Sequence, residues 1–130
     1  MKKRVLVIED NEQNLYLVTF LLERHGYAVS AARDGVIGIE QAAREIPDLI
    51  LLDIQLPLLD GHAVAKQLKS CDELAEVPIV AVTSYAMPGD REKAIESGCS
   101  GYIEKPINPD TFISQIEKFL GRYTGGKGEA

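Results

Sequence analysis

The sequence predicts an α/β domain, a doubly wound five-stranded parallel sheet with five helices. Short apolar runs suited to buried strands alternate with segments of helical periodicity from Val5 almost to the C-terminus. The chain of 130 residues has the size of one domain and leaves no room for a second folded module. We therefore expect one domain over residues 1–121, followed by a flexible glycine-rich tail over residues 122–130.

The alternation fixes the order of the expected elements. The strands are Arg4–Ile8, Tyr27–Ala31, Leu49–Leu52, Ile79–Val82 and Gly101–Ile103. The helices start near Glu12, Gly35, Gly61, Gly89 and Pro109. Strands that alternate with helices in this way form a parallel sheet with helices on both faces.

The first expected helix shows both of its ends. Asn11 can cap it, and Glu12 places a carboxylate in the first turn, where the helix dipole favours a negative charge. The inward stripe is predicted to contain Leu15, Val18 and Leu22. Gly26 is expected to end this helix, and His25 before it suits a helix C-terminus better than a ligand or a base.

The segment "LILLDIQLP" holds the third strand. Its apolar run Leu49–Leu52 is typical of a strand buried on both faces, and such a strand has no obvious use for the carboxylate of Asp53 at its end. Taken alone, Asp53 is most simply a turn former before Pro57. A functional interpretation of Asp53 therefore depends on what else lies beside it.

The last two helices are predicted from their periodicity. In the helix that starts near Gly89, we expect Ala94 and Ile95 to face inward and Glu92 and Glu96 to face solvent. The final helix repeats apolar residues at helical spacing until Gly121 stops the pattern. These apolar residues are Phe112, Ile113, Ile116, Phe119 and Leu120.

Composition excludes several classes of function. A net charge of −6 argues against direct binding of nucleic acid, which requires a basic surface. No apolar stretch is long enough to cross a membrane, and the N-terminal segment lacks a signal-peptide pattern, so we expect a cytoplasmic protein. The cysteines Cys71 and Cys99 lie far apart, which makes a disulfide framework or a zinc site improbable, and His62 has no partner histidine.

Polar residues follow four of the five expected strands. They are Glu9 and Asp10, then Asp53, then Thr83 and Ser84, and finally Lys105. Each has an ordinary explanation by itself, as a helix-terminal acid, a turn former, a loop hydroxyl or a surface charge. The carboxyl ends of parallel strands meet at one edge of a sheet, so the joint occurrence favours a shared site there.

This set of residues suits a magnesium ion and a phosphoryl group. Three carboxylates in one pocket raise one another's pKa unless a cation neutralises them, and Mg²⁺ suits a site with few carboxylates. The ammonium of Lys105 and the hydroxyl of Thr83 are what a phosphoryl group in transfer needs around its oxygens. Asp53, at the end of the central buried strand, is the predicted nucleophile, which would form an acyl phosphate.

With these residues in place, the chain resembles the receiver domains of two-component response regulators. The resemblance rests on Glu9-Asp10, on Asp53 with Leu56-Pro57 and Asp60-Gly61, on Thr83, and on Lys105-Pro106 with Tyr102 before it. It covers residues 4 to about 121 and is closest to the stand-alone cell-polarity regulators (DivK-like) and to receivers of hybrid histidine kinases. It implies the flavodoxin-like (CheY-like) strand order 2-1-3-4-5.

The resemblance also implies a role for each residue of the site. Asp53 accepts the phosphoryl group from a phosphohistidine, while Asp10, Glu9 through water, and the backbone carbonyl of Gln55 hold Mg²⁺. The protein then catalyses only its own phosphorylation and dephosphorylation and is not otherwise an enzyme. Its phosphoryl donor is a histidine kinase or a histidine phosphotransfer protein.

The remaining implied roles concern switching. Lys105 contacts the phosphoryl oxygens, next to a cis peptide bond to Pro106. Thr83 moves to bond the phosphoryl group, and Tyr102 swings inward behind it. These motions bias an equilibrium between two conformations of the downstream binding surface, which comprises the helix near Gly89, the strand Gly101–Ile103 and the last helix.

Two variable positions tune the lifetime of the phosphorylated state in such families, here Gln55 and Tyr85. A bulky Tyr85 shields the acyl phosphate, whereas an amide at Gln55 orients a water. We hypothesise that shielding dominates and that the phosphorylated state is long-lived. The oligomeric state stays open between a monomer and a weak dimer.

Other functions fit the residues less well. A phosphatase of the haloacid-dehalogenase-like class needs a second aspartate two positions after the nucleophile, where this chain has Gln55. A flavin-binding module needs a phosphate loop after the first strand, where this chain has "EDNEQN". The alternative that stays open is a receiver fragment of a hybrid histidine kinase or multidomain regulator, which shares the chemistry.

Overall fold

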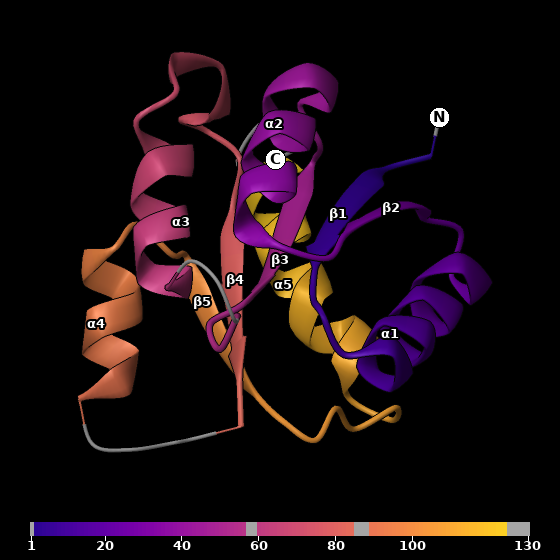
Figure 1. Ribbon diagram of the computed structural model, residues 1–130. Coiled ribbons are helices and arrows are strands. Elements are labelled where there is room, and N and C mark those ends of the chain that lie inside the picture. Colours follow the sequence, from indigo (N-terminus) through magenta and orange to yellow (C-terminus); the bar gives the residue numbers. More distant parts are fainter. Residues whose placement is uncertain (1, 57–59, 85–88, 125–130) are drawn as a thin grey trace.

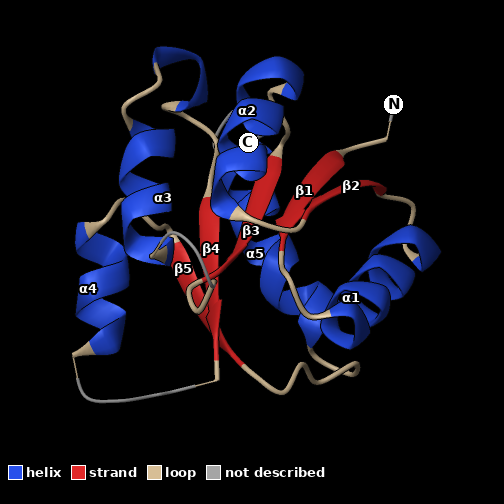
Figure 2. Ribbon diagram, viewed as in Figure 1, coloured by secondary structure: helices blue, strands red, loops and turns tan. Residues whose placement is uncertain are grey.

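The computed structural model describes residues 2–56, 60–84 and 89–124, with side chains up to Leu120. In these residues strands and helices alternate along the chain, as Figures 1 and 2 show. The strands are β1 (Arg4–Ile8), β2 (Ala28–Ala32), β3 (Leu49–Asp53), β4 (Ile79–Thr83) and β5 (Gly101–Glu104). The helices are α1 (Glu12–Arg24), α2 (Gly35–Glu45), α3 (Gly61–Lys69), α4 (Asp90–Glu96) and α5 (Phe112–Thr124), with a short 3₁₀ turn η1 (Asp72–Leu74).

The described strands form one parallel sheet in the order β2-β1-β3-β4-β5. This is the predicted order 2-1-3-4-5, and it places β3 at the centre of the sheet. Helices α1 and α5 cover one face, and α2, α3 and α4 cover the other (Figure 1). The carboxyl ends of all strands therefore open along one edge, which lies at the bottom of Figure 1.

Alternate residues of the buried strands pack on opposite faces of the sheet. In β3, Leu49 and Leu51 pack under α1 and α5, whereas Ile50 and Leu52 pack under α2 and α3. All four are at most 2% exposed. A strand buried on both faces has no polar alternation, which is why the sequence shows a continuous apolar run there.

The predicted start of the first helix is confirmed. The Asn11 side chain accepts a hydrogen bond from the backbone N–H of Asn14 at 2.9 Å, so Asn11 caps α1. At the other end, His25 is the C-terminal cap, and its Nδ1 lies 2.9 Å from the Leu21 carbonyl oxygen. Gly26 follows with φ of 88°, a left-handed conformation that favours glycine.

Several predicted strand boundaries were wrong by one residue. β2 runs over Ala28–Ala32 rather than 27–31, because the Tyr27 N–H donates to the Leu22 carbonyl at the end of α1 and the ladder with β1 continues to Ala32. Strands β3, β4 and β5 each include one polar residue beyond the apolar run, because the ladder pairs Asp53 with Val82 and Thr83 with Glu104. Backbone pairing does not depend on the polarity of the side chain.

For the last two helices, the start of α4 near Gly89 is confirmed, whereas the buried face of α4 and both ends of α5 were wrongly predicted. Helix α4 begins at Asp90, directly after Gly89. Its only buried residue is Ala94, and the side chain of Ile95 is 48% exposed rather than inward. Helix α5 begins at Phe112 rather than Pro109, since Asn108 first closes a turn with the N–H groups of Asp110 and Thr111. It also continues through Gly121 to Thr124, so three residues assigned to the tail are helical.

Among the described residues, no helix has the length and apolar character that a membrane crossing requires.

Candidate phosphoacceptor and metal site

The predicted site residues meet at the carboxyl edge of the sheet. Asp53 is the last residue of β3, and Thr83 is the last residue of β4. Glu9 directly follows β1, and Lys105 directly follows β5. The buried central strands thus hold these side chains at fixed positions.

Glu9, Asp10 and Asp53 form an acidic cluster. Carboxylate oxygens from the three residues all lie within 4.8 Å of one another. Glu9 is 4% exposed and Asp53 is 3% exposed, whereas Asp10 faces solvent. The convergence that the sequence predicted is therefore present in the structure.

The cluster perturbs the acidity of Glu9. Burial raises the pKa of Glu9 from 4.5 to about 7, and the hydrogen bond and negative charge of Asp53 act in the same direction. The ammonium of Lys105 and the N–H of Asn11, which donates to Glu9 Oε2 at 3.2 Å, oppose this rise. Since the raising effects dominate, Glu9 keeps its proton to a higher pH than an exposed glutamate does.

Lys105 is the cation nearest to the cluster among the described residues. Its Nζ atom lies 3.3 Å from Glu9 Oε1 and 3.4 Å from Asp53 Oδ2, and its side chain is only 11% exposed. The peptide bond between Lys105 and Pro106 is cis, as the sequence interpretation expected. The lysine thus lies across the site with its charge directed at the buried carboxylates.

Gln55 contacts the site from the loop after β3. Its backbone N–H donates to Asp53 Oδ1 at 2.9 Å. Its side-chain Oε1 accepts hydrogen bonds from the backbone N–H of Ser84 at 3.0 Å and from the Ser84 hydroxyl at 2.9 Å. Sequence reasoning missed this bridge, because nothing in the spacing of Gln55 and Ser84 connects them.

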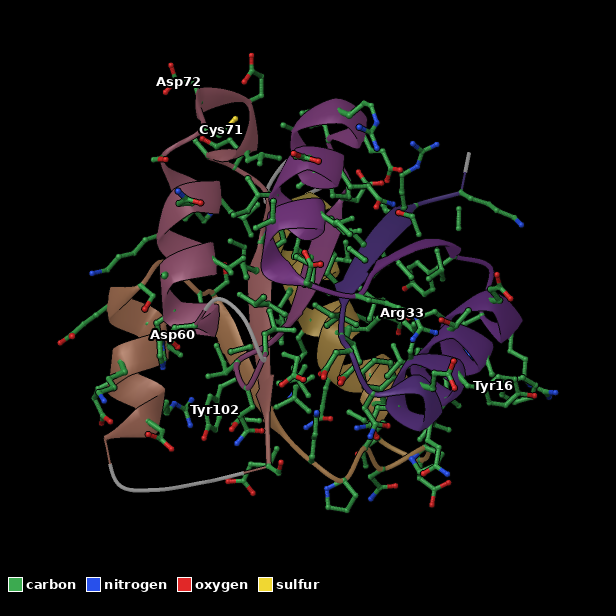
Figure 3. All side chains as sticks on the ribbon, viewed as in Figure 1. Tyr16, Arg33, Asp60, Cys71, Asp72 and Tyr102 are labelled. Atoms are coloured by element: carbon green, nitrogen blue, oxygen red, sulfur yellow. The ribbon has the colours of Figure 1, made fainter. Side chains whose placement is uncertain are left out.

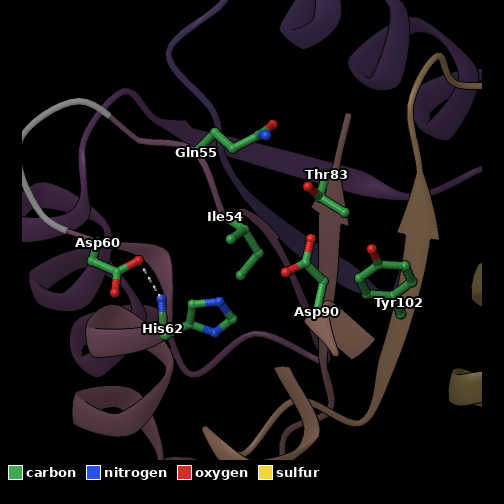
Figure 4. Close-up of a pocket in the computed structure, with 7 residues that line it drawn as sticks. All are labelled: Ile54, Gln55, Asp60, His62, Thr83, Asp90 and Tyr102. Atoms are coloured by element: carbon green, nitrogen blue, oxygen red, sulfur yellow. Dashed lines mark hydrogen bonds between the residues drawn. The ribbon is translucent and has the colours of Figure 1, made fainter. Parts of the chain in front are cut away.

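A pocket of about 250 Å³ opens beside the acidic cluster, between α3 and α4. Figure 4 shows its lining residues, which are Ile54, Gln55, Asp60, His62, Thr83, Asp90 and Tyr102. Thr83 and Tyr102, the two predicted switch residues, thus share one cavity. Glu9, Asp10 and Lys105 do not line it, so the pocket adjoins the acidic cluster and is distinct from it.

His62 has a partner that the sequence did not reveal. Its Nδ1 lies 3.1 Å from the hydroxyl oxygen of Ser97, and that hydroxyl donates to the Lys93 carbonyl at 2.8 Å. Since the serine proton is already used, His62 is the donor in the first contact. His62 on α3 is thereby hydrogen-bonded to Ser97, the residue that caps the end of α4.

Two further residues of the sequence interpretation, Tyr85 and Pro57, lie outside the described residues.

Strand order and site together define the class of this protein, a receiver-type signalling domain. Comparison with known proteins agrees, because residues 5–117 match the profile of the response regulator receiver domain. The chain belongs to this family, whose members signal in two-component systems.

Similar proteins support the assignment. The chain is 46% identical over 121 residues to the polar-differentiation response regulator DivK of Brucella anthropi, covering 93% of this chain and 98% of the relative. A CheY-like receiver domain protein from Methanospirillum hungatei has a TM-score of 0.89 at 27% identity and covers 98% of this chain and 100% of its own. The receiver domain of a sensor histidine kinase from Pseudomonas aeruginosa has a TM-score of 0.83 at 31% identity, covering 96% and 99%.

Proposed function

We propose that this domain accepts a phosphoryl group on Asp53 in a two-component phosphorelay. The donor is a phosphohistidine of a histidine kinase or of a histidine phosphotransfer protein. The observation that carries the proposal is the position of Asp53, a buried carboxylate with a second acid and the ammonium of Lys105 within hydrogen-bonding or ion-pair distance. Such a charge arrangement at a strand end has no structural necessity and suits phosphoryl transfer.

The transfer itself is a displacement at phosphorus. An oxygen of the Asp53 carboxylate forms a bond to phosphorus while the bond from phosphorus to the donor imidazole nitrogen breaks, and the bonding electron pair stays on that nitrogen. The product is an acyl phosphate. Lys105 stabilises the negative phosphoryl oxygens, because its ammonium already lies 3.4 Å from Asp53 Oδ2.

The donor set fits Mg²⁺. Glu9, Asp10 and Asp53 offer carboxylate oxygens within 4.8 Å of one another, and carboxylates are the hard oxygen ligands that Mg²⁺ prefers. Asp10, Asp53, Glu9 through water, and the backbone carbonyl of Gln55 would hold the ion. When bound, Mg²⁺ neutralises charge on the phosphoryl oxygens. The similar Pseudomonas receiver is described with a magnesium ion coordinated in its active site cleft.

Switching is assigned to Thr83 and Tyr102, which line the same pocket. A phosphoryl group on Asp53 draws the Thr83 hydroxyl toward it, and Tyr102 occupies the vacated space. The movement changes the surface of α4, β5 and α5, through which a downstream protein binds. Ile95 on this surface is an exposed apolar residue suited to such a contact.

A receiver module within a hybrid histidine kinase is the second candidate. The structural similarity to the receiver domain of a Pseudomonas sensor histidine kinase favours it. The chemistry at Asp53 is the same in both cases, and only the protein that reads the phosphorylated state differs. A magnesium-dependent aspartyl-phosphate phosphatase is less compatible, because the position of its second aspartate holds Gln55.

The test is intact mass spectrometry after incubation with Mg²⁺ and acetyl phosphate. We expect a gain of one phosphoryl group that disappears in Asp53→Asn and in the presence of a chelator. Asp72→Asn is the matched control, because Asp72 is exposed and lies at the far end of the molecule from Tyr102 (Figure 3). A phosphoryl gain that survives in Asp53→Asn would disprove the assignment of the acceptor.

A further inference from the structure

The side chain of Gln55 connects two loops at the rim of the site. Its Oε1 accepts from both the backbone N–H and the hydroxyl of Ser84, at 3.0 and 2.9 Å. A backbone N–H can only donate, so the amide atom facing Ser84 must be the oxygen, and the orientation of the amide is fixed by chemistry. The loop after β3 is thereby attached to the segment that follows β4.

The same residue also contacts the proposed phosphoacceptor. The backbone N–H of Gln55 donates to Asp53 Oδ1 at 2.9 Å. Ser84 directly follows Thr83, the hydroxyl that is proposed to move toward the phosphoryl group. Gln55 therefore links Asp53 on one side to the residue that directly follows Thr83 on the other.

The amide is only half satisfied in this arrangement. Its Nε2 atom is buried and has no hydrogen-bond partner in the part of the chain that the structure describes. A buried N–H donor without a partner opposes the conformation that holds it. The bonds to Ser84 thus stabilise a side-chain position that is otherwise unfavourable, and their loss releases it.

We propose that Gln55 is a positioning residue that restrains Ser84, and through it Thr83, in the unphosphorylated conformation. This inference rests on the proposed function and deepens it. When Asp53 carries a phosphoryl group, its new oxygens compete with Gln55 Oε1 for the polar hydrogens at the end of β4. A restraint that favours the starting conformation lowers the population that can complete phosphorylation.

This role differs from the water-orienting role that the sequence suggested for Gln55. An oxygen that already accepts two hydrogen bonds from Ser84 has little capacity left to orient a water in the unphosphorylated protein. The restraint acts before phosphoryl transfer, whereas water orientation acts on the lifetime of the product. The two roles are therefore separable by measurement.

The restraint itself is tested without phosphoryl transfer. Gln55→Met keeps the length of the side chain and removes the acceptor, so we expect the Ser84 amide hydrogen to exchange with solvent about three- to tenfold faster by NMR. Gln55→Glu retains an acceptor oxygen and should restore the protection of this amide. Gln67→Met, at an exposed position of α3, is the matched control and should leave Ser84 unchanged.

The effect on the reaction is then measured as the initial rate of phosphorylation by acetyl phosphate with Mg²⁺. We expect about a three- to tenfold increase for Gln55→Met and none for Gln67→Met. Ser84→Ala removes the hydroxyl bond and keeps the N–H bond, so it should give a smaller increase. This second variant provides an independent test should Gln55→Met alter the fold.

The outcomes separate the two proposals. Unchanged exchange of the Ser84 amide in Gln55→Met would overturn the restraint, and so would faster exchange combined with an unchanged or lower phosphorylation rate. A wild-type protein that gains no phosphoryl group would overturn the proposed function. The Ser84 exchange result would still decide whether Gln55 holds this segment.

Discussion

The ammonium nitrogen of Lys105 lies 3.4 Å from Oδ2 of Asp53, although β4 separates the two strands that carry these residues. The lysine reaches across the sheet edge and also approaches Glu9 Oε1 at 3.3 Å. One positive charge thus faces two buried carboxylates, and the exposed Asp10 adds a third. When all three carboxylates are ionised, the ammonium of Lys105 balances only one of them, so we expect the stability of the protein to depend on Lys105, on the protonation of Glu9 and on a bound cation.

Replacing Lys105 by methionine is expected to destabilise the metal-free protein. At pH 8 the loss should be about 1–3 kcal/mol, because two buried carboxylates are left without their counter-ion. Urea denaturation in the presence of a chelator measures it. The matched control is Lys118→Met on the exposed side of α5, which should change stability by less than about 0.5 kcal/mol. Equal losses for the two variants would mean that the Lys105 ion pairs do not stabilise the fold.

The raised pKa of Glu9 predicts a specific dependence of stability on pH. The folded protein keeps the Glu9 proton up to about pH 7, whereas the unfolded chain releases it near pH 4.5. Between these values the unfolded state binds fewer protons, so this contribution to stability falls as the pH rises and levels off above about 7. The total change attributable to Glu9 is at most about 3 kcal/mol.

Glu9→Gln isolates this contribution, because glutamine is neutral at every pH. In a chelator, we expect the variant and the wild type to have similar stability near pH 5 and the variant to be more stable at pH 8. Urea denaturation at several pH values between 5 and 8 provides the comparison. A constant difference between the two proteins across this range would contradict a raised pKa.

Binding of Mg²⁺ to the three carboxylates should stabilise the folded protein, because the ion neutralises their negative charge. At a concentration tenfold above its dissociation constant, Mg²⁺ is expected to stabilise the wild type by about 1.4 kcal/mol, which raises Tm by roughly 4 °C. Asp10→Asn should lose most of this shift, because it removes the exposed carboxylate of the cluster. Asp72→Asn should keep it. A full shift in Asp10→Asn would remove Asp10 from the set of metal ligands.

The site residues that the sequence predicts are those that lie at the ends of strands. Glu9, Asp53, Thr83 and Lys105 all follow from strand ends, because a parallel sheet brings those ends to one edge whatever the details of packing. The contacts of Gln55 with Ser84 and of His62 with Ser97 do not follow. They join loops and helices whose relative placement depends on side-chain packing, and local pattern carries no information about it.

The errors in the predicted fold have a similar origin. Ile95 is exposed because α4 is short and lies against the sheet only through Ala94, so the apolar pattern overstated the buried face. Helix α5 continues past Gly121 because one glycine costs a helix only about 1 kcal/mol. The strand positions were predicted well, since a strand buried on both faces tolerates only apolar residues.

The phosphorylated state is predicted to be long-lived, through shielding of the acyl phosphate by Tyr85. After removal of the donor, mass spectrometry should show slow loss of the phosphoryl group. Tyr85→Ala is expected to lose it about tenfold faster, because water then reaches the phosphorus more readily. Equally rapid loss in the wild type and in Tyr85→Ala would reject shielding.

Two buried glycines are crowded by different kinds of atoms, Gly61 by main-chain atoms and Gly38 by side-chain atoms. A Cβ atom on Gly61 would lie 2.5 Å from Ile54 Cα and 2.7 Å from the Ile54 carbonyl oxygen, so the main chain must move. A Cβ atom on Gly38 would lie 2.6 Å from Cδ1 and 2.9 Å from Cγ1 of the buried Ile8, so a side chain must shift there but the main chain need not. We expect Gly61→Ala to cost about 2–3 kcal/mol and Gly38→Ala about 1 kcal/mol or less, since alanine also favours the helix.

Gly61→Ala should also slow phosphorylation, because Ile54 directly precedes Gln55 and follows Asp53, so a shift of this loop moves the proposed acceptor. Gly38→Ala, which lies on α2 under the same face of the sheet, should leave the rate nearly unchanged. Urea denaturation and the acetyl phosphate assay on both variants give the comparison. If Gly38→Ala were the more damaging change, the side-chain packing around Ile8 would be less adaptable than the main chain at Ile54, contrary to this expectation.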